Sequence, residues 1–519
     1  MKNNKHLLKI KFGHVFAFII ILISMILLVL FIKGDGQLVL SYQNDYSTKV
    51  EGPFESSNST SRYALTESIV KNHSFNLTKD LGKFSSPDVV YFNNHFFTIF
   101  TPGVSFIGIP FYLIGEQFNL TQLITYLSVL IFAVINIVLV TNLARKLGAN
   151  IYAAILSGFG FIFATNALVY SLTYTQHLES TAVILLSILN ALEERTFTRN
   201  LLLGFYFGVG LLLDIPNAVM LAPIILYVIA RHVEIRELKN KISLNFKLVI
   251  GAFIVGLAPL IILFAIYNHA TTGSFTKIGQ TIGGTDYFKV QSNNGSTQNQ
   301  PANVEINKEL YLIKLPFKTR NELNGFDILL LSNERSWLFY SPIVLVGTLG
   351  LYFAYKNKKT SVAANLATAV VLLDLLVYSA FGDPWGGWAF GPRYLIPAAA
   401  IMMAAVGPAI YKLRKNIFFI LIFFVVFAYS IYVSSLGALT TAAIPPKIEA
   451  VNLNVPIPYT YEYNQGFVKD NKSGNLVYNI WAHKYLSLTV YWYTLIFIIL
   501  LIGVFNYILI LKGEDEENV

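Results

Sequence analysis

The sequence predicts an all-α fold, a polytopic helical membrane protein with about twelve transmembrane helices. Hydrophobic residues make up 55% of the 519 positions and charged residues only 13%. The mean hydropathy is +0.56. Apolar runs long enough to cross roughly 30 Å of hydrocarbon as helices recur from one end of the chain to the other. No soluble globular protein requires such a composition.

The apolar runs define the predicted helices in order. Spans are predicted near residues 14–32, 121–142, 151–170, 176–192, 201–213, 217–230, 248–268, 337–355, 363–381, 394–411, 417–436 and 488–511. A further apolar run, 96–114, contains Thr101, Pro102, Gly103 and Pro110. Because proline and glycine interrupt helices, we expect this run to form a helix that lies in or dips into the membrane interface rather than a full span.

The first predicted span follows Lys2, Lys5, Lys9 and Lys11 and so resembles a signal peptide. Its apolar core is too long for a signal peptide, and no small-residue cleavage site follows it. We therefore predict an uncleaved first span.

Basic residues set the predicted orientation. The short connectors at 145–146, 195–199, 231–241, 356–359 and 412–415 all carry Lys or Arg. The positive-inside rule then places both termini in the cytoplasm of a multi-pass cell-membrane protein. Long external loops are expected at 33–116 and 269–336 within a core domain of residues 1–411. A third external loop is expected at 437–485, within the C-terminal region of transmembrane helices, residues 412–519.

Composition also excludes several classes of function. The net charge is +9, but the clustered cations flank predicted spans, so no nucleic-acid partner is expected. The absence of cysteine excludes disulfides, Cys-ligated zinc and thiol catalysis. No histidines have metal-ligand spacing, and no glycine-rich nucleotide loop precedes a helix. We predict no metal-ligating residues and no nucleotide cofactor, and leave a divalent metal open.

The connector at 382–394 reads GDPWGGWAFGPRY and is the most unusual stretch of the chain. Rigid aromatics, backbone-permissive glycines and a planar cation are the materials of a ligand site at a membrane surface. The other unusual motifs also fall on the predicted external side. A transporter would instead concentrate polar residues near mid-membrane. We therefore expect the working face to be external.

The external motifs have a characteristic order. They are SRYALTESIVKNHSF from Ser61, DVVYFNNHFFTIFTPGVSFIGIPFYLIG from Asp88, YTQH from Tyr174, DIPN from Asp214, YNHATTGSF from Tyr267, LLLSNERSWLFYSP from Leu329 and WGGWAFGPRYLIP from Trp385. This succession resembles the GT-C superfamily of integral-membrane glycosyltransferases. It is most similar to the polyprenyl-phosphate-sugar-dependent branch, which includes protein O-mannosyltransferases and the lipid A aminoarabinose transferase. The resemblance runs from the first span to about Pro397.

The resemblance implies a glycosyltransferase that moves a sugar from a polyprenyl-phosphate carrier to a glycan, lipid or protein acceptor at the outer leaflet. It further implies inversion at the anomeric carbon, with a carboxylate of the first external loop as the base. Membrane lipids are the remaining expected partners. The chain departs from the family pattern at two positions. Ser59 stands where the first-loop acid is expected, and Phe100 stands where many relatives have a lysine.

The candidate catalytic residues are therefore the other first-loop acids, Asp88 and Asp45, although a loop aspartate is commonly just solvated. Arg393, Arg335 and Arg62 are candidate phosphate ligands, because guanidinium binds two oxygens at once. Arg393 and Arg335 could instead be interfacial anchors or partners of nearby acids such as Glu334 and Asp383. Arg62 could instead pair with Glu51, Glu55 or Glu67.

Five further residues complete the candidate substrate-binding set: Tyr63 in the SRYA stretch, His177, Asp383, Trp385 and Trp388. Asp383 could orient Arg393, bind a sugar hydroxyl, contact a metal or simply cap the turn before Pro384. The tryptophans could stack on a sugar or belong to an interfacial aromatic belt. His177 could donate to a sugar or phosphate oxygen or be structural.

Asp374 is predicted to lie inside a span, where an unpaired charge is costly. Proton coupling by Asp374 would indicate a lipid or glycan transporter, whereas a helix-to-helix hydrogen bond is the structural alternative that we favour. A third hypothesis, suggested by Ser59 and Phe100, is a non-catalytic relative that binds polyprenyl-phosphate lipid.

Overall fold

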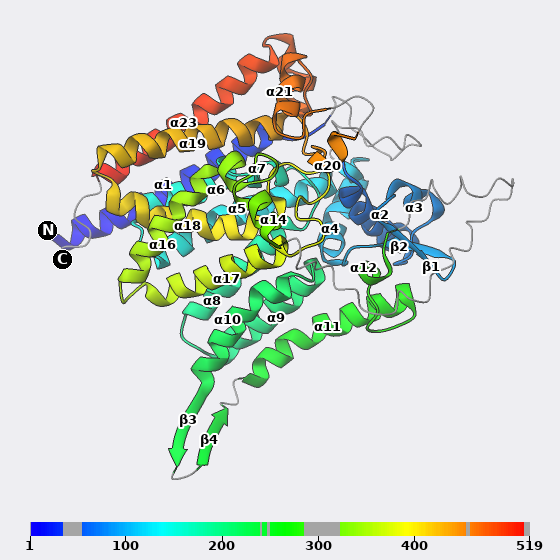
Figure 1. Ribbon diagram of the computed structural model, residues 1–519, viewed down its shortest axis with the longest axis horizontal. Coiled ribbons are helices and arrows are strands. Elements are labelled where there is room, and N and C mark those ends of the chain that lie inside the picture. Colours follow the sequence, from blue (N-terminus) through cyan, green and yellow to red (C-terminus); the bar gives the residue numbers. More distant parts are fainter. Residues whose placement is uncertain are drawn as a thin grey trace.

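The computed structural model describes residues 2–34, 54–238, 241–246, 250–284, 322–452 and 457–512. The candidate base Asp45 lies outside these ranges. The molecule is an elongated bundle of helices, with most of the short elements gathered at one end (Figure 1).

Seven of the described helices are long and apolar enough to cross a membrane. They are α1 (Lys2–Leu30), α5 (Thr121–Lys146), α11 (Ile250–Thr272), α17 (Ser361–Ser379), α18 (Ile396–Leu413), α19 (Ile417–Leu439) and α23 (Leu488–Lys512). Shorter apolar helices accompany them: α6 (Ile151–Phe163), α8 (His177–Leu192), α9 (Phe197–Leu213), α10 (Asn217–His232), and η3 (Pro342–Val346) continued by α16 (Gly347–Lys356). The predicted fold class is confirmed, whereas the number of spans stays a prediction.

The remaining elements are short. They are α2 (Ser57–Asn72), α3 (Lys79–Phe84), α4 (Gly103–Gln117), α7 (Ala167–Tyr170), α12 (Gly279–Ile282), α14 (Glu322–Leu330), α15 (Trp337–Tyr340), η4 (Arg393–Leu395), α20 (Lys447–Ala450), α21 (Glu462–Lys469), α22 (Leu476–Ile480) and η5 (Ala482–Lys484). Strands β1 (Val89–Phe92) and β2 (His95–Thr98) form one antiparallel hairpin, and β3 (Val233–Leu238) and β4 (Lys241–Phe246) form another.

Two segments differ from the sequence-based expectation. The run at 96–114 begins with β2, because Asn93 and Asn94 adopt positive φ values of 49° and 65° and so close a tight hairpin. Only α4 follows as a helix. The span predicted at 337–355 is divided at Ser341, whose non-helical backbone (φ −151°, ψ 56°) precedes Pro342. A residue before proline is disfavoured in the helical region, which accounts for the break between α15 and η3.

The centre of the bundle is α18. Of its span, 89% is buried, compared with 22 to 56% for the other six long helices. Alanines dominate its sequence, and small residues allow helix backbones to approach closely in a membrane. α16 approaches the α18 backbone closely at Gly350, where an added Cβ would collide with the carbonyl oxygen of Ala405. α18 therefore acts as the surface on which the neighbouring helices are positioned.

Asp374 connects α17 to α18. Its side chain is fully buried, and its Oδ2 accepts a hydrogen bond of 3.2 Å from the backbone N–H of Ala398, in the first turn of α18. A carboxylate at a helix N-terminus satisfies one of the backbone donors that have no partner within the helix. The favoured interpretation of Asp374 as a helix-to-helix hydrogen bond is thus confirmed.

The two ends of the bundle differ. Both chain termini lie at one end, and α2, α3, the β1–β2 hairpin, α12 and α20 lie at the other (Figure 1). We call the latter the loop-bearing end. Its motifs come from segments that are far apart in the sequence, so the fold itself brings them together.

Replacing Gly350 by alanine is expected to lower the stability of the protein by about 1–3 kcal/mol, because α16 and α18 must then separate. Thermal unfolding in detergent measures this change. Gly251→Ala in α11 is the matched control, since nothing lies within 4 Å of an added Cβ there. Equal melting temperatures for the two variants would contradict the assigned contact.

Candidate active site at the loop-bearing end

Four separate segments line a small cavity at the loop-bearing end. The lining residues come from the segment before α2 (Glu55, Ser56), the end of α7 and the connector that follows it (Tyr170, Thr173, Thr175), the 382–394 connector (Trp388, Arg393) and the turn after α19 (Ala442, Ala443). The 382–394 connector is therefore one wall of this cavity.

Arg393 is the first residue of η4 and lines this cavity. Gly386, Gly387 and Gly391 precede it with φ of 73°, 63° and 62°, which allows the connector to turn back on itself. The Nε of Arg393 is buried and has no hydrogen-bond partner in the described structure. None of the ion pairs between described residues involves Arg393. Arg393 thus retains donor capacity for an anionic ligand.

The acid and tryptophans of the connector have mixed roles. Asp383 Oδ1 accepts from the N–H groups of Gly386 and Gly387 at 3.1 and 3.3 Å, so it caps the turn. Burial raises the pKa of Asp383, although the charge of Arg393 opposes that shift. Trp388 is 41% exposed, and its Nε1 donates to Glu449 at 2.6 Å. Trp385 contributes its carbonyl oxygen to Arg335 at 3.2 Å.

Arg335 has a different environment from Arg393. It is fully buried, and its guanidinium donates to backbone carbonyls only, at 2.8 to 3.5 Å. The acceptors are Glu334, Trp385, Gly387, Ile444 and Tyr459. With five carbonyls around it, Arg335 fastens the connector to the segments after α19 and has no donor aimed at the cavity. Its geometry is that of a structural residue.

Arg62 on α2 is also buried. Its NH1 donates to the Asn58 side chain and its NH2 to Gln176 Oε1, both at 2.7 Å. The guanidinium carbon lies 3.9 Å from the centre of the Phe100 ring, a cation–π contact. Burial lowers the pKa of Arg62 to about 10, opposed by the nearby carboxylates of Asp214 and Asp88. Arg62 therefore stays charged at neutral pH.

Asp88 immediately precedes β1 and is held against α2. Ser57 Oγ donates to its Oδ2 at 2.7 Å, and Ser61 Oγ donates to its backbone oxygen at 2.6 Å. Burial raises the pKa of Asp88, while the Ser57 hydrogen bond and then the charges of Arg393 and Arg62 lower it. A partly exposed carboxylate with a raised pKa, next to two cations, has the properties of a general base.

His177 begins α8 on the same side of the bundle. It is 5% exposed, and its Nε2 has no partner among the described residues. Its ring meets the edge of Tyr170 at 5.0 Å between centroids. The Tyr170 hydroxyl accepts a hydrogen bond of 3.1 Å from Phe390 N–H in the connector. Tyr170 therefore links His177 to the connector.

Tyr63 lies away from the cavity lining. Its hydroxyl donates to Thr121 Oγ1 at 3.0 Å, and its ring packs against Phe54 and Tyr112 at 4.8 and 5.9 Å between centroids. Only 1% of its surface is exposed. Tyr63 thus packs α2 against α4 and α5.

Sequence reasoning missed the polar relay behind Arg62. Gln176 accepts from Arg62 and donates through Nε2 to Asp214 Oδ2 at 2.9 Å. Burial raises the pKa of Asp214 and the charge of Arg62 lowers it. Asp214 opens the DIPN motif, so a polar residue between two apolar helices was the available signal.

Sequence reasoning also missed a buried ion pair. Glu55 was considered only as a partner of Arg62, but its carboxylate pairs with Lys33 at the end of α1. It also accepts from Thr441 Oγ1 at 2.8 Å and Ala442 N–H at 2.7 Å. Glu67 likewise pairs with Lys71 rather than with Arg62. A lysine on the predicted external side, against the positive-inside rule, was the signal for such a pair.

The described residues contain no group of three or more His, Asp or Glu side chains placed to hold a metal ion. The site as described consists of arginines, a carboxylate, hydroxyls and aromatic rings.

No protein-family model and no curated protein matches the chain. Among solved structures, the fold is similar to that of ArnT from Cupriavidus metallidurans in the apo state, with 12% identity, a TM-score of 0.49 and coverage of 96% of this chain and 77% of ArnT. ArnT from the same organism bound to undecaprenyl phosphate is also similar, with 12% identity, a TM-score of 0.46 and coverage of 97% of this chain and 76% of ArnT. An Archaeoglobus fulgidus oligosaccharyltransferase in complex with Zn and sulfate has 15% identity, a TM-score of 0.47 and coverage of 86% of this chain and 56% of that chain. Function therefore has to be inferred from the residues of this chain.

Glu55→Gln is expected to destabilise the protein by about 3–5 kcal/mol, because it leaves Lys33 buried without a counter-charge. Adding Lys33→Met to this variant should recover part of the loss, since no buried charge then remains. Thermal unfolding in detergent measures both. Asp470→Asn is the control, because it breaks an exposed pair with Lys472 that is worth about 0–1 kcal/mol.

Proposed function

We propose that this protein is a membrane glycosyltransferase that moves a sugar from a polyprenyl-phosphate carrier to an acceptor at the loop-bearing end. The observation that carries the proposal is the arrangement of Arg393, Arg62 and Asp88. The buried guanidinium of Arg62, the half-buried guanidinium of Arg393 and a carboxylate of raised pKa lie close enough to influence one another's ionisation. Of the three residues, Arg393 lines the cavity at the loop-bearing end of the helix bundle.

This set meets the requirements of the reaction that the sequence motifs imply. The acceptor hydroxyl oxygen attacks the anomeric carbon from the face opposite the phosphate. The bond between the anomeric carbon and the phosphate oxygen breaks, and its electron pair leaves with the polyprenyl phosphate. Because attack and departure are on opposite faces, the configuration inverts, and Asp88 accepts the hydroxyl proton. The leaving phosphate gains negative charge, which Arg393 stabilises through its available donors.

The other residues act through these three. Arg62 has most of its donors engaged, so it contributes mainly positive charge. Asp383 and Tyr170 hold the connector and thereby position Arg393. Trp388 is partly exposed and lines the cavity, and we assign it the role of stacking on the sugar. Arg335 and Tyr63 are assigned structural roles, on the basis of their contacts.

The transporter hypothesis has less support. It assigned proton coupling to Asp374, which is engaged with the N-terminus of α18. The non-catalytic hypothesis rests on Ser59 and Phe100. It predicts binding of polyprenyl phosphate without turnover, and the kinetic experiment below separates it from the transferase.

Asp88→Asn is expected to lower turnover by about 10²–10⁴-fold, because the acceptor loses its general base. Arg393→Ala should lower it by about 10²–10³-fold, as expected for loss of one group that stabilises developing negative charge. Purified protein with radiolabelled polyprenyl-phosphate sugars measures both rates.

Asp470→Asn and Lys472→Ala are the matched controls, since both residues are exposed at the loop-bearing side of the chain. Wild-type turnover in Asp88→Asn and Arg393→Ala would overturn the assigned roles. Donor binding by the wild type without any transfer would favour the non-catalytic hypothesis.

The pH dependence tests Asp88 separately. A base must be deprotonated, so turnover should rise with pH through the raised pKa of Asp88. The Ser57 hydrogen bond lowers that pKa, and Ser57→Ala should therefore shift the acid limb to higher pH. Ser361→Ala, at the opposite end of the bundle, is the control. An acid limb that does not move in Ser57→Ala would exclude Asp88 as the base.

A further inference from the structure

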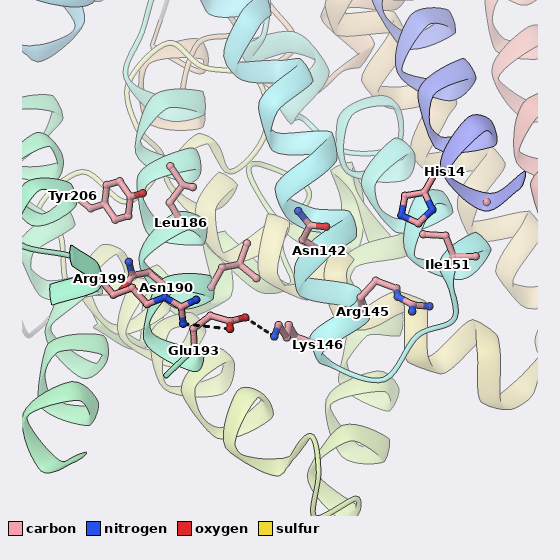
Figure 2. Close-up of a pocket in the computed structure, with 12 residues that line it drawn as sticks. His14, Asn142, Arg145, Lys146, Ile151, Leu186, Asn190, Glu193, Arg199 and Tyr206 are labelled. Carbon is pink, nitrogen blue, oxygen red and sulfur yellow. Dashed lines mark hydrogen bonds and ion pairs between the residues drawn. The ribbon is translucent and has the colours of Figure 1, made fainter. Parts of the chain in front are cut away.

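A second and larger cavity lies at the end of the bundle that carries the termini. Its volume is about 650 Å³, and it is lined by residues from α1, α5, α6, α8 and α9. Figure 2 shows Arg145, Lys146, Glu193 and Arg199 along one side of it, with Leu186 and Tyr206 above them. The cavity is far from Arg393 in the fold and belongs to no part of the proposed reaction.

The charged side of this cavity is positive. Glu193 binds Lys146 Nζ at 2.6 Å and Arg199 NH1 at 3.3 Å. The hydrogen bond from Lys146 is the main cause that lowers the pKa of Glu193, so this carboxylate is ionised. Arg145 donates to the Ala149 carbonyl at 3.4 Å and takes part in none of the ion pairs between described residues. Arg145, Lys146 and Arg199 thus give this cavity three cations against the one carboxylate of Glu193.

Most of the uncharged lining residues are apolar. Ile151, Leu186 and Leu189 are each partly exposed, and Tyr206 adds a ring. Asn142 and Asn190 also line the cavity. A cavity lined by both cations and apolar side chains matches an amphiphile with an anionic head group, whereas a purely soluble anion leaves the apolar side chains uncovered.

The location indicates which amphiphile. The cavity is bounded by apolar helices and lies at the end where the positive-inside rule places the cytoplasmic connectors. Basic pockets between helices on that side bind the head groups of anionic lipids. We propose that this cavity binds an anionic phospholipid of the surrounding leaflet, with its phosphodiester at Arg145, Lys146 and Arg199 and its acyl chain along Leu186 and Leu189.

Native mass spectrometry of the full chain in detergent tests this inference. Dioleoylphosphatidylglycerol should remain bound under conditions that remove dioleoylphosphatidylcholine, which has the same acyl chains without net charge. Arg145→Gln and Lys146→Gln should each weaken retention about fivefold, the effect expected for one cation near an anionic lipid. Both residues are exposed, so their replacement is compatible with folding.

Two further variants separate a built site from general attraction. Lys358→Gln removes an exposed lysine at the same end but outside the cavity, and should leave retention unchanged. Leu189→Trp adds bulk among the apolar lining residues without changing charge, and should reduce retention. The proposal would be overturned if the two lipids were retained equally, or if Lys358→Gln weakened retention as much as Lys146→Gln does. It would also be overturned if soluble glycerol phosphate displaced dioleoylphosphatidylglycerol as well as a second anionic lipid does.

Discussion

The loop-bearing end depends on one buried cation. Arg335 donates to five carbonyl oxygens, which belong to the adjacent Glu334, to the 382–394 connector and to the chain after α19. A guanidinium without a counter-ion is costly to bury, and hydrogen bonds to charged groups are the strong ones, so these carbonyls are held firmly in place. Two of them, those of Trp385 and Gly387, belong to the connector that leads to Arg393. By holding the connector, Arg335 therefore also positions Arg393, whose Nε has no hydrogen-bond partner among the described residues.

Arg335 and Arg393 have similar sequence contexts but different hydrogen-bond partners. Both follow turn residues and precede an apolar helix. Arg335 is surrounded by acceptors that the protein supplies, and nothing is left for a ligand. Arg393 meets aromatic rings instead, and its Nε is left buried without a partner. A buried polar atom without a partner costs free energy in the empty protein, and that cost is recovered when an anionic group binds.

The sequence was sufficient for the apolar helices, since length and hydropathy depend only on local composition. It was also sufficient to bring the connector and the first loop to one end, because topology follows from counting spans. Side-chain partners could not be predicted in this way. Glu55 pairs with Lys33 across 22 positions and with Ala442 across 387, and no periodic pattern encodes such separations. The hairpin before α4 was missed because its apolar strand continues directly into an apolar helix.

The two departures from the family pattern are consistent with this geometry. Phe100 stands where the resemblance leads one to expect a lysine, and its ring lies against the guanidinium of Arg62. A lysine there would bring a further cation beside Arg62, whose pKa is already lowered by burial and by Arg393. The ring removes that repulsion and stabilises the charge through its face. In the proposed function, Asp88 takes the carboxylate role that Ser59 cannot fill, and Ser57 on the same helix donates to it. The proposal thus assigns a different cation and a different base around the same space, so neither substitution by itself argues against catalysis.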